Sequence, residues 1–175
     1  MKWRKLKSVD YIVIHAAATR PDMDIGADEI RRLHRKKGWF DIGYHYVIRR
    51  CGAVEKGRPD ERPGAHARGF NHISLGVCLV GGAETIGPKV TPTSDEWYAK
   101  WANKAKGEDN YTDDQWYALE ALVLKLKQQY PDAKVLGHRD LPNVNKACPS
   151  FNAKTWWWDV LKGEGMLFTP EENTT

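Results

Sequence analysis

The sequence predicts an α/β fold of mixed α+β character, in which a central mixed β-sheet is flanked by helices within a single domain. The chain has 175 residues, the length of one domain with an insertion or a tail. Short apolar runs rich in β-branched residues predict buried strands, and segments with helical spacing lie between and after them. Apolar residues make up 41% of the chain and charged residues 29%, which is the balance of a globular protein rather than a disordered one.

The first strand is predicted over residues 11–14. This Tyr-Ile-Val-Ile run is too short for a helix and ends at His15. A helix is predicted over residues 27–37, where Ile30 and Leu33 provide a thin apolar face. The first histidine of interest is thus expected at the end of a buried strand.

A β-hairpin is predicted over residues 43–50 and 53–55, because two β-rich runs flank a turn that contains glycine. Tyr44 and Tyr46 are two residues apart, so within a strand they are expected on one face while His45 points to the other. We expect Tyr46 to pack in the core and His45 to have a structural or a surface role.

A long loop and two further strands are predicted after the hairpin. Residues 58–71 contain two prolines and two glycines and are expected to form a long ordered loop. A buried strand is predicted over residues 75–82, an apolar run that ends in glycines. A short strand over residues 135–137 leads into His138.

Three helices are predicted in the second half of the chain. Thr112 and Gln115 match a capping box ahead of an apolar stripe that stops at Pro131. A similar box at residues 93–96 predicts a shorter helix that ends near residue 107, and a last helix is predicted over residues 153–161. Its three consecutive tryptophans cannot share one helix face, so one or two are expected in the core and the rest exposed.

Charge and cysteine content exclude several classes of protein. The net charge of +4 suits an anionic partner but is too weak to indicate nucleic-acid binding. Three cysteines are too few for a disulfide framework, and the odd number leaves at least one thiol unpaired. No apolar run approaches the length of about 18 residues that a membrane span needs, and no signal-peptide core follows the basic start. We therefore expect a chain made in the cytoplasm, without membrane insertion.

Two histidines and one cysteine form a candidate metal site. His15 and His138 lie at the ends of predicted buried strands, and Cys148 follows ten residues after His138. Catalytic zinc takes three protein ligands and leaves a fourth position for water, and ligands at neighbouring strand ends converge at one edge of a sheet. Taken one at a time, however, such residues are more often hydrogen-bonded histidines and a small buried cysteine.

Six short motifs, in a fixed order, change this assessment. They are Ile-His-Ala-Ala-Ala-Thr at residues 14–19, Gly-Tyr-His-Tyr at 43–46, Gly-Ala-His-Ala at 64–67 with Asn71, Ser-Leu-Gly-Val-Cys-Leu-Val-Gly at 74–81, Gly-His-Arg-Asp at 137–140 and Lys-Ala-Cys-Pro-Ser-Phe at 146–151. Together they resemble the type 2 family of zinc-dependent N-acetylmuramoyl-L-alanine amidases, which includes the peptidoglycan recognition proteins. The resemblance covers residues 10–158 and is strongest to the amidase-type endolysins of short-tailed coliphages.

The resemblance implies a site of seven residues. The ligands of one Zn²⁺ per chain fall on His15, His138 and Cys148. The catalytic residues fall on Tyr44 and Lys146. His66 and Asn71 of the glycine-rich loop are expected to bind the substrate, with hydrogen bonding within the loop as the alternative.

The resemblance also implies a domain organisation. A zinc amidase domain spans residues 1–162, and a flexible tail spans residues 163–175. Residues 83–111 form an inserted segment with an extra helix, which is longer here than in the phage relatives.

The implied reaction is hydrolysis of the amide that joins the lactyl group of N-acetylmuramic acid to L-alanine. Zinc makes water nucleophilic near neutral pH and polarises the carbonyl. Lys146 is expected to offset the negative charge on the tetrahedral intermediate, and Tyr44 to donate a hydrogen bond to it. The identity of the general base stays open.

Two alternatives belong to other classes of function. A cysteine hydrolase would use Cys148 as nucleophile and His138 as base. A peptidoglycan-binding protein without turnover would resemble those recognition proteins that lack the cysteine ligand. Because Cys148, Tyr44 and Lys146 are all present, we expect turnover.

The resemblance finally implies partners and location. The partner is the muramyl peptide of peptidoglycan, and the protein is expected to be a monomer that reaches the cell wall after release by a phage hole-forming protein. Some phage relatives also inhibit the phage RNA polymerase, and the basic start at residues 2–7 is compatible with such a contact. No nucleic-acid partner is expected.

Overall fold

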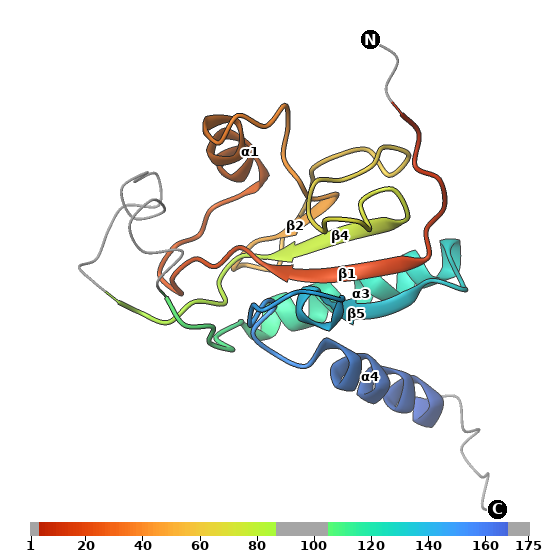
Figure 1. Ribbon diagram of the computed structural model, residues 1–175. Helices are drawn as coiled ribbons and strands as arrows, with labels where there is room; N and C mark the ends of the chain where they lie inside the picture. The colour runs from red at the N-terminus through yellow and green to blue at the C-terminus, as the bar shows by residue number, and fades with distance from the viewer. Residues whose placement is uncertain (1–3, 87–104, 168–175) are drawn as a thin grey trace, which may run out of the picture.

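A mixed five-stranded sheet with helices on both faces forms the protein (Figure 1). The computed structural model describes residues 4–86 and 105–167. The elements in chain order are β1 (Tyr11–Ala16), α1 (Ala27–Lys36), β2 (Tyr46–Ile48), β3 (Val54–Lys56), β4 (Ser74–Leu79), α3 (Asp113–Gln129), β5 (Lys134–Gly137), the 3₁₀ turn η1 (His138–Asp140) and α4 (Ala153–Leu167). The predicted fold class is confirmed.

The strands are arranged in the order β3-β2-β4-β1-β5. β1 is central and pairs in parallel with β4 on one side and β5 on the other. β2 is parallel to β4 and antiparallel to β3, so the predicted hairpin is confirmed and sits at one edge of the sheet. Every residue of β4 and all but the first of β1 are buried, as their continuous apolar runs predict.

Alternate residues of β1 face two different cores. Ile12 and Ile14 pack against α3 and α4 in the larger hydrophobic cluster. Val13 faces the opposite side, where α1 and the loop of residues 57–73 cover the sheet. His15 shares the face of Val13 because side chains alternate along a strand. The lone polar residue of this buried strand therefore lies under the loops and away from the long helices.

The capping box predicted at the start of α3 is present. Gln115 N donates to Thr112 Oγ1 at 3.2 Å, and Thr112 N donates to Gln115 Oε1 at 3.2 Å. Leu119, Val123 and Leu126 follow on the buried face of this helix. The local sequence thus determines where α3 begins and which side it buries.

The last helix is longer than predicted. α4 begins at Ala153 as predicted but runs to Leu167, six residues beyond the expected end at residue 161. Gly163 lies within this helix, because a glycine inside a helix costs only about 1 kcal/mol, too little to stop it. Trp157 is buried and Trp158 exposed, as predicted for consecutive tryptophans. The predicted helix near residues 93–107 falls largely outside the described residues.

The prediction that Tyr44 and Tyr46 share one face is wrong. Tyr46 packs against the cluster formed with α3 and α4, whereas Tyr44 packs against the cluster formed with α1. β2 begins only at Tyr46, so the two-residue periodicity of a strand does not extend back to Tyr44. This local departure turns the Tyr44 ring towards the histidine of β1.

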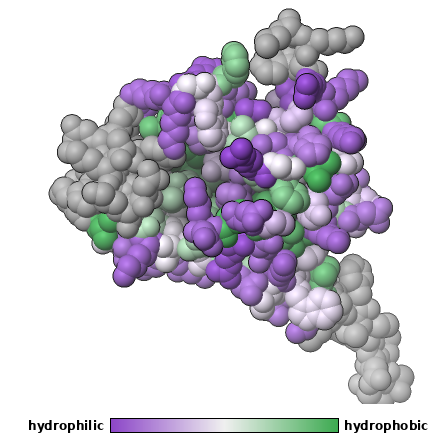
Figure 2. Space-filling model, viewed as in Figure 1, coloured by the Kyte–Doolittle hydropathy of each residue, from purple (hydrophilic) through white to green (hydrophobic). Residues whose placement is uncertain are grey.

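Figure 2 shows that the face seen in Figure 1 is mostly hydrophilic, with hydrophobic residues in small separate patches. Within the described ranges, no helix combines the length and the apolar character needed to cross a membrane.

Candidate metal centre

The three predicted metal ligands come together at one edge of the sheet. His15, His138 and Cys148 each offer a ligand atom, and these atoms all lie within 4.8 Å of one another. The Sγ atom of Cys148 is 3.8 Å from Nδ1 of His15, and the rings of His15 and His138 have centroids 4.6 Å apart. Among the described residues, this is the one group of its kind.

Strand pairing explains why the two histidines meet. β1 and β5 are parallel neighbours, with Ile14 opposite Gly137, so His15 and His138 follow at the same carboxyl edge. Cys148 arrives on the loop after η1. The backbone N–H of Arg139 donates to the Cys148 carbonyl at 2.8 Å, and the N–H of Ala16 donates to Cys148 Sγ at 3.2 Å.

The residues at this edge fit a zinc ion. Zinc bonds of about 2.0–2.1 Å to nitrogen and about 2.3 Å to sulfur put the ligand atoms of a tetrahedron about 3.5 Å apart. The separation of 3.8 Å between Cys148 Sγ and His15 Nδ1 is close to that spacing. Two imidazoles and one thiolate are also a donor set that suits zinc and leaves a fourth position open.

Burial keeps the candidate metal ligands in a defined protonation state. Burial, and then the neighbouring His66 and His138, hold the pKa of His15 well below its usual range. Burial and the Lys146 ammonium likewise lower the pKa of His138. Burial raises the pKa of the Cys148 thiol to about 11. The two imidazoles are therefore neutral at pH 7, the form that binds metals, while the thiol has to release its proton when a metal binds.

Tyr44 and Lys146 both lie beside the ligands. The Tyr44 ring has its centroid 5.2 Å from that of His15, and its hydroxyl forms a hydrogen bond with the buried Cys78 thiol. Lys146 is exposed and lines the same groove as His138. The structure thus brings both residues to the candidate metal site from separate loops.

A groove of about 410 Å³ opens beside the ligands. Its lining includes His138 and Lys146. It also includes His66 and Asn71 of the glycine-rich loop. Asn71 Oδ1 accepts hydrogen bonds from the backbone N–H groups of His66 at 2.8 Å and Ala67 at 2.9 Å. Asn71 Nδ2 makes no hydrogen bond to any residue that the structure describes, so the amide can still donate into the groove.

Further histidines surround His15. His66 Nδ1 lies 2.9 Å from His15 Nε2, and its ring also contacts the ring of His45. His45 is fully buried; its Nδ1 accepts from Gly76 N at 2.9 Å, and its Nε2 donates to the Arg62 carbonyl at 2.9 Å. Of the two roles expected for His45, structural or surface, its burial and both hydrogen bonds favour the structural one.

Sequence reasoning missed several residues of this region. Ser74, fully buried at the start of β4, has its Oγ 3.4 Å from His66 Nε2. Trp39, Asn143 and Asn145 also line the groove. The signal for Ser74 was a hydroxyl at the head of an otherwise apolar buried strand. The groove residues belong to loops, and their sequence carries no periodicity that would have revealed them.

Comparison with known proteins gives the class to which this site belongs. The N-acetylmuramoyl-L-alanine amidase family matches residues 5–151 of the chain. The endolysin of Klebsiella phage KP32 is 40% identical over 157 residues, which cover 90% of this chain and 91% of the relative. The endolysin of Escherichia phage T7 is 38% identical over the same length, with the same coverage.

A solved structure shares the fold. The N-acetylmuramoyl-L-alanine amidase LysC from Clostridium intestinale superposes with a TM-score of 0.65 at 23% identity, covering 94% of this chain and 93% of that one. The chain belongs to the N-acetylmuramoyl-L-alanine amidase family. It is a peptidoglycan amidase of the phage endolysin type.

Proposed function

We propose that the chain cleaves the amide between N-acetylmuramic acid and L-alanine with the help of one Zn²⁺ held by His15, His138 and Cys148. The observation that carries this proposal is the convergence of three ligand atoms within 4.8 Å, with His138, one of the three residues, in the wall of the groove. When bound there, zinc would polarise the scissile carbonyl and make water nucleophilic near neutral pH.

Lys146 stabilises the charge that develops during the reaction. Its ammonium lies in the groove wall with His138, close enough to lower the pKa of that histidine and to oppose the rise in the pKa of Cys148. A cation in this position offsets the negative oxygen that forms when the amide carbonyl is attacked.

Tyr44 supplies a hydroxyl close to the ligands. Its ring is held between the rings of His15 and His34, with centroids at 5.2 and 5.6 Å. In the resting protein this hydroxyl donates a hydrogen bond to the Cys78 sulfur. The hydroxyl is in a position to exchange this contact for a hydrogen bond to the substrate carbonyl oxygen, which strengthens as charge builds up there.

The groove binds the muramyl peptide. Asn71 presents its amide nitrogen, and Asn143 and Asn145 add further amides, which suit the hydroxyl and peptide groups of such a ligand. The Trp39 side chain, 40% exposed, offers an aromatic face on which a sugar ring can stack. His66 contributes to the wall of the same groove.

The cellular setting follows from the same proposal. The protein acts on the cell wall as a monomer, and it reaches the wall after a phage hole-forming protein releases it from the cytoplasm. The endolysin relatives, which match the chain over about nine tenths of its length, support this setting.

Two measurements on one preparation test the proposal. Elemental analysis of the purified protein is expected to find one zinc per chain, and mass spectrometry of digested peptidoglycan is expected to find stem peptides with a free N-terminal L-alanine. Dialysis against a chelator should abolish the release of these stem peptides, and added zinc should restore it. Full activity in excess chelator, together with inhibition by thiol alkylation, would instead identify Cys148 as a nucleophile.

A further inference from the structure

His66 is held in place by close packing on the sheet. Its side chain is 8% exposed, and its ring lies against Gly76 of β4. A Cβ atom at Gly76 would come within 2.6 Å of the His66 ring, and one at Gly64 within 2.4 Å. Only glycine at these two positions leaves room for the ring, so the backbone around His66 is shaped to accept it.

The hydrogen bonds of Ser74 determine where the proton of His66 lies. Ser74 Oγ donates its hydrogen to the Phe70 carbonyl at 2.7 Å. With its hydrogen used, this oxygen can only accept from His66 Nε2, which lies 3.4 Å away. His66 Nε2 therefore carries the ring proton, and the Nδ1 atom of the neutral ring is an acceptor.

The position of the proton in His66 in turn determines the position of the proton in His15. His66 Nδ1 is an acceptor 2.9 Å from His15 Nε2, so His15 donates its own ring proton there. The other nitrogen of His15, Nδ1, is left with a free lone pair, and this atom is the one that faces Cys148 Sγ at 3.8 Å. His15, His66 and Ser74 are all buried, which keeps water from replacing these hydrogen bonds.

His45 does not compete for this role. Although its ring contacts that of His66, its two nitrogens are occupied by Gly76 N and the Arg62 carbonyl, each at 2.9 Å. The chain of hydrogen bonds therefore runs in one direction, from His15 through His66 and Ser74 to the carbonyl of Phe70.

We infer that His66 and Ser74 are positioning residues that fix the tautomer and orientation of His15, so that His15 Nδ1 is presented to the metal. Both ring nitrogens of His66 are used inside the protein, so its role in the groove is limited to the ring edge. The inference rests on the proposed metal site at His15, His138 and Cys148. Outer partners of this kind typically change metal affinity by about 10- to 100-fold.

Two substitutions at His66 separate a positioning role from simple packing. In His66→Asn the amide oxygen takes the place of Nδ1 and can still accept from His15. In His66→Gln the amide reaches only the place of Nε2. We expect His66→Asn to bind zinc within about threefold of the unaltered protein, whereas His66→Gln and His66→Ala lose about 10- to 100-fold in affinity.

Zinc affinity is measured by competition with a chromophoric chelator, and the tautomers by long-range ¹H–¹⁵N spectra of the metal-free protein. The spectra are expected to show protonated Nε2 in both His15 and His66, and a tautomer mixture for His15 in His66→Ala. Ser74→Ala is expected to give the same change in the spectra with a smaller loss of affinity. Val123→Ala, a change in the core on the other face of the sheet, is the control for lost stability and leaves zinc affinity unchanged.

Two outcomes would overturn the inference. The first is that His66→Ala binds zinc as tightly as the unaltered protein. The second is that His66→Asn and His66→Gln lose zinc affinity equally. Absence of zinc binding by the unaltered protein would instead contradict the proposed metal site itself, so the two failures are distinguishable.

Discussion

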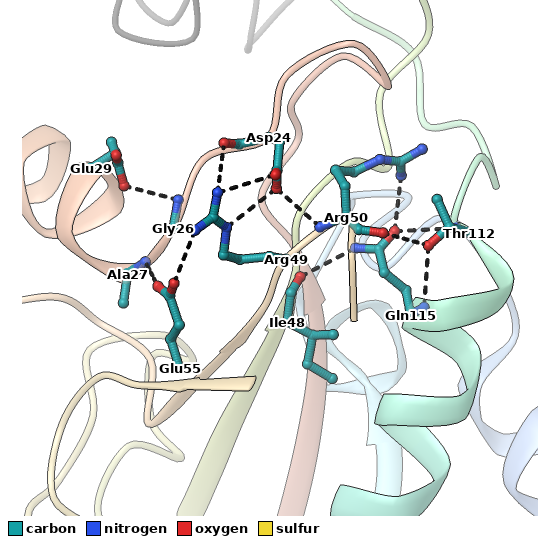
Figure 3. A network of polar contacts seen from close by, with 10 residues as sticks. All are labelled: Asp24, Gly26, Ala27, Glu29, Ile48, Arg49, Arg50, Glu55, Thr112 and Gln115. Atoms are coloured by element: carbon teal, nitrogen blue, oxygen red, sulfur yellow. Dashed lines mark hydrogen bonds and ion pairs between the residues drawn. The ribbon is translucent and has the colours of Figure 1, made fainter. Parts of the chain in front are cut away.

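The histidine cluster and the arginine network are both polar groups that join distant segments, but they complete their hydrogen bonds differently. The histidine cluster consists of His15, His45, His66 and His138. The arginine network, drawn in Figure 3, links the region before α1 to the β2–β3 hairpin and to the start of α3. Its members are Asp24, Gly26, Ala27, Glu29, Ile48, Arg49, Arg50, Glu55, Thr112 and Gln115.

Gln115 shows how the arginine network is completed. Its Oε1 accepts from Thr112 N at 3.2 Å and from Arg50 Nη1 at 2.9 Å, and its Nε2 donates to the Ile48 carbonyl at 3.2 Å and the Val80 carbonyl at 2.8 Å. All four hydrogen-bonding positions of this fully buried amide are used. Arg49 similarly pairs with Asp24 and Glu55.

The histidine cluster is left incomplete at His15 Nδ1 and at His138, whose ring makes no hydrogen bond to any residue that the structure describes. His15 Nδ1 has the Cys148 sulfur at 3.8 Å as its neighbour, a distance too long for a strong hydrogen bond. The closed network therefore stabilises the fold, whereas the open cluster holds a lone pair ready for a metal. Three substitution experiments test this distinction, and a fourth concerns a buried histidine that belongs to neither group.

The largest effect is expected from removing a metal ligand. His138→Ala and Cys148→Ala should each lose zinc and lower the rate of peptidoglycan cleavage by roughly 10³-fold or more, because a catalytic metal supplies several kcal/mol of transition-state stabilisation. Metal content and release of free N-terminal L-alanine are the readouts. Retention of stoichiometric zinc by either variant would remove that residue from the ligand set.

The second largest effect is expected to be a lower rate of peptidoglycan cleavage without loss of zinc. Tyr44→Phe and Lys146→Ala each remove one group that stabilises the developing charge, a loss of about 2.7–4 kcal/mol or 10²–10³-fold in kcat. Neither residue is a ligand, so zinc content should stay at one per chain. An unchanged cleavage rate in Lys146→Ala would exclude this lysine from the mechanism.

A substitution in the arginine network should lower the stability of the fold and leave zinc binding unchanged. Gln115→Ala leaves the Arg50 guanidinium and two buried carbonyls without a partner, which is expected to lower the free energy of unfolding by about 3 kcal/mol. Urea denaturation measures this loss, and zinc affinity of the folded protein should not change. Gln128→Ala, at an exposed position on the same helix, is the matched control and should cost less than about 0.5 kcal/mol.

The smallest effect concerns pH and a buried histidine outside the metal ligands. Burial lowers the pKa of His34 to about 4, from an ordinary value of 6.5. Between these values the unfolded chain binds more protons than the folded one, so stability is present above pH 6.5 and is lost as the pH falls towards 4. This group should cost about 2 kcal/mol of unfolding free energy between pH 7 and pH 5.

His34→Asn tests this pH dependence. The amide oxygen can keep the hydrogen bond that His34 Nδ1 accepts from Gly43 N at 3.0 Å, yet it does not titrate. Urea denaturation at pH 7 and pH 5 should show a smaller loss in the variant. His72→Asn, at an exposed position, is the control, and an equal pH dependence in His34→Asn and the unaltered protein would contradict the prediction.

The sequence by itself determined the local elements of the fold and pointed to the candidate ligands. The capping box at Thr112, the buried run of β1 and the hairpin around Cys51-Gly52 depend on neighbours a few residues apart, and short-range backbone geometry is sufficient to predict them. The order of motifs singled out His15, His138 and Cys148 through resemblance, whereas spacing alone left them ambiguous.

Tertiary structure alone decided how these elements are used. The hydrogen-bonded chain from His15 to Ser74, the turn of Tyr44 away from the face of Tyr46, and the four bonds of Gln115 join segments up to 67 residues apart. Such contacts depend on which loops pack over which face of the sheet. No local pattern encodes that packing, because it results from burying many side chains at once.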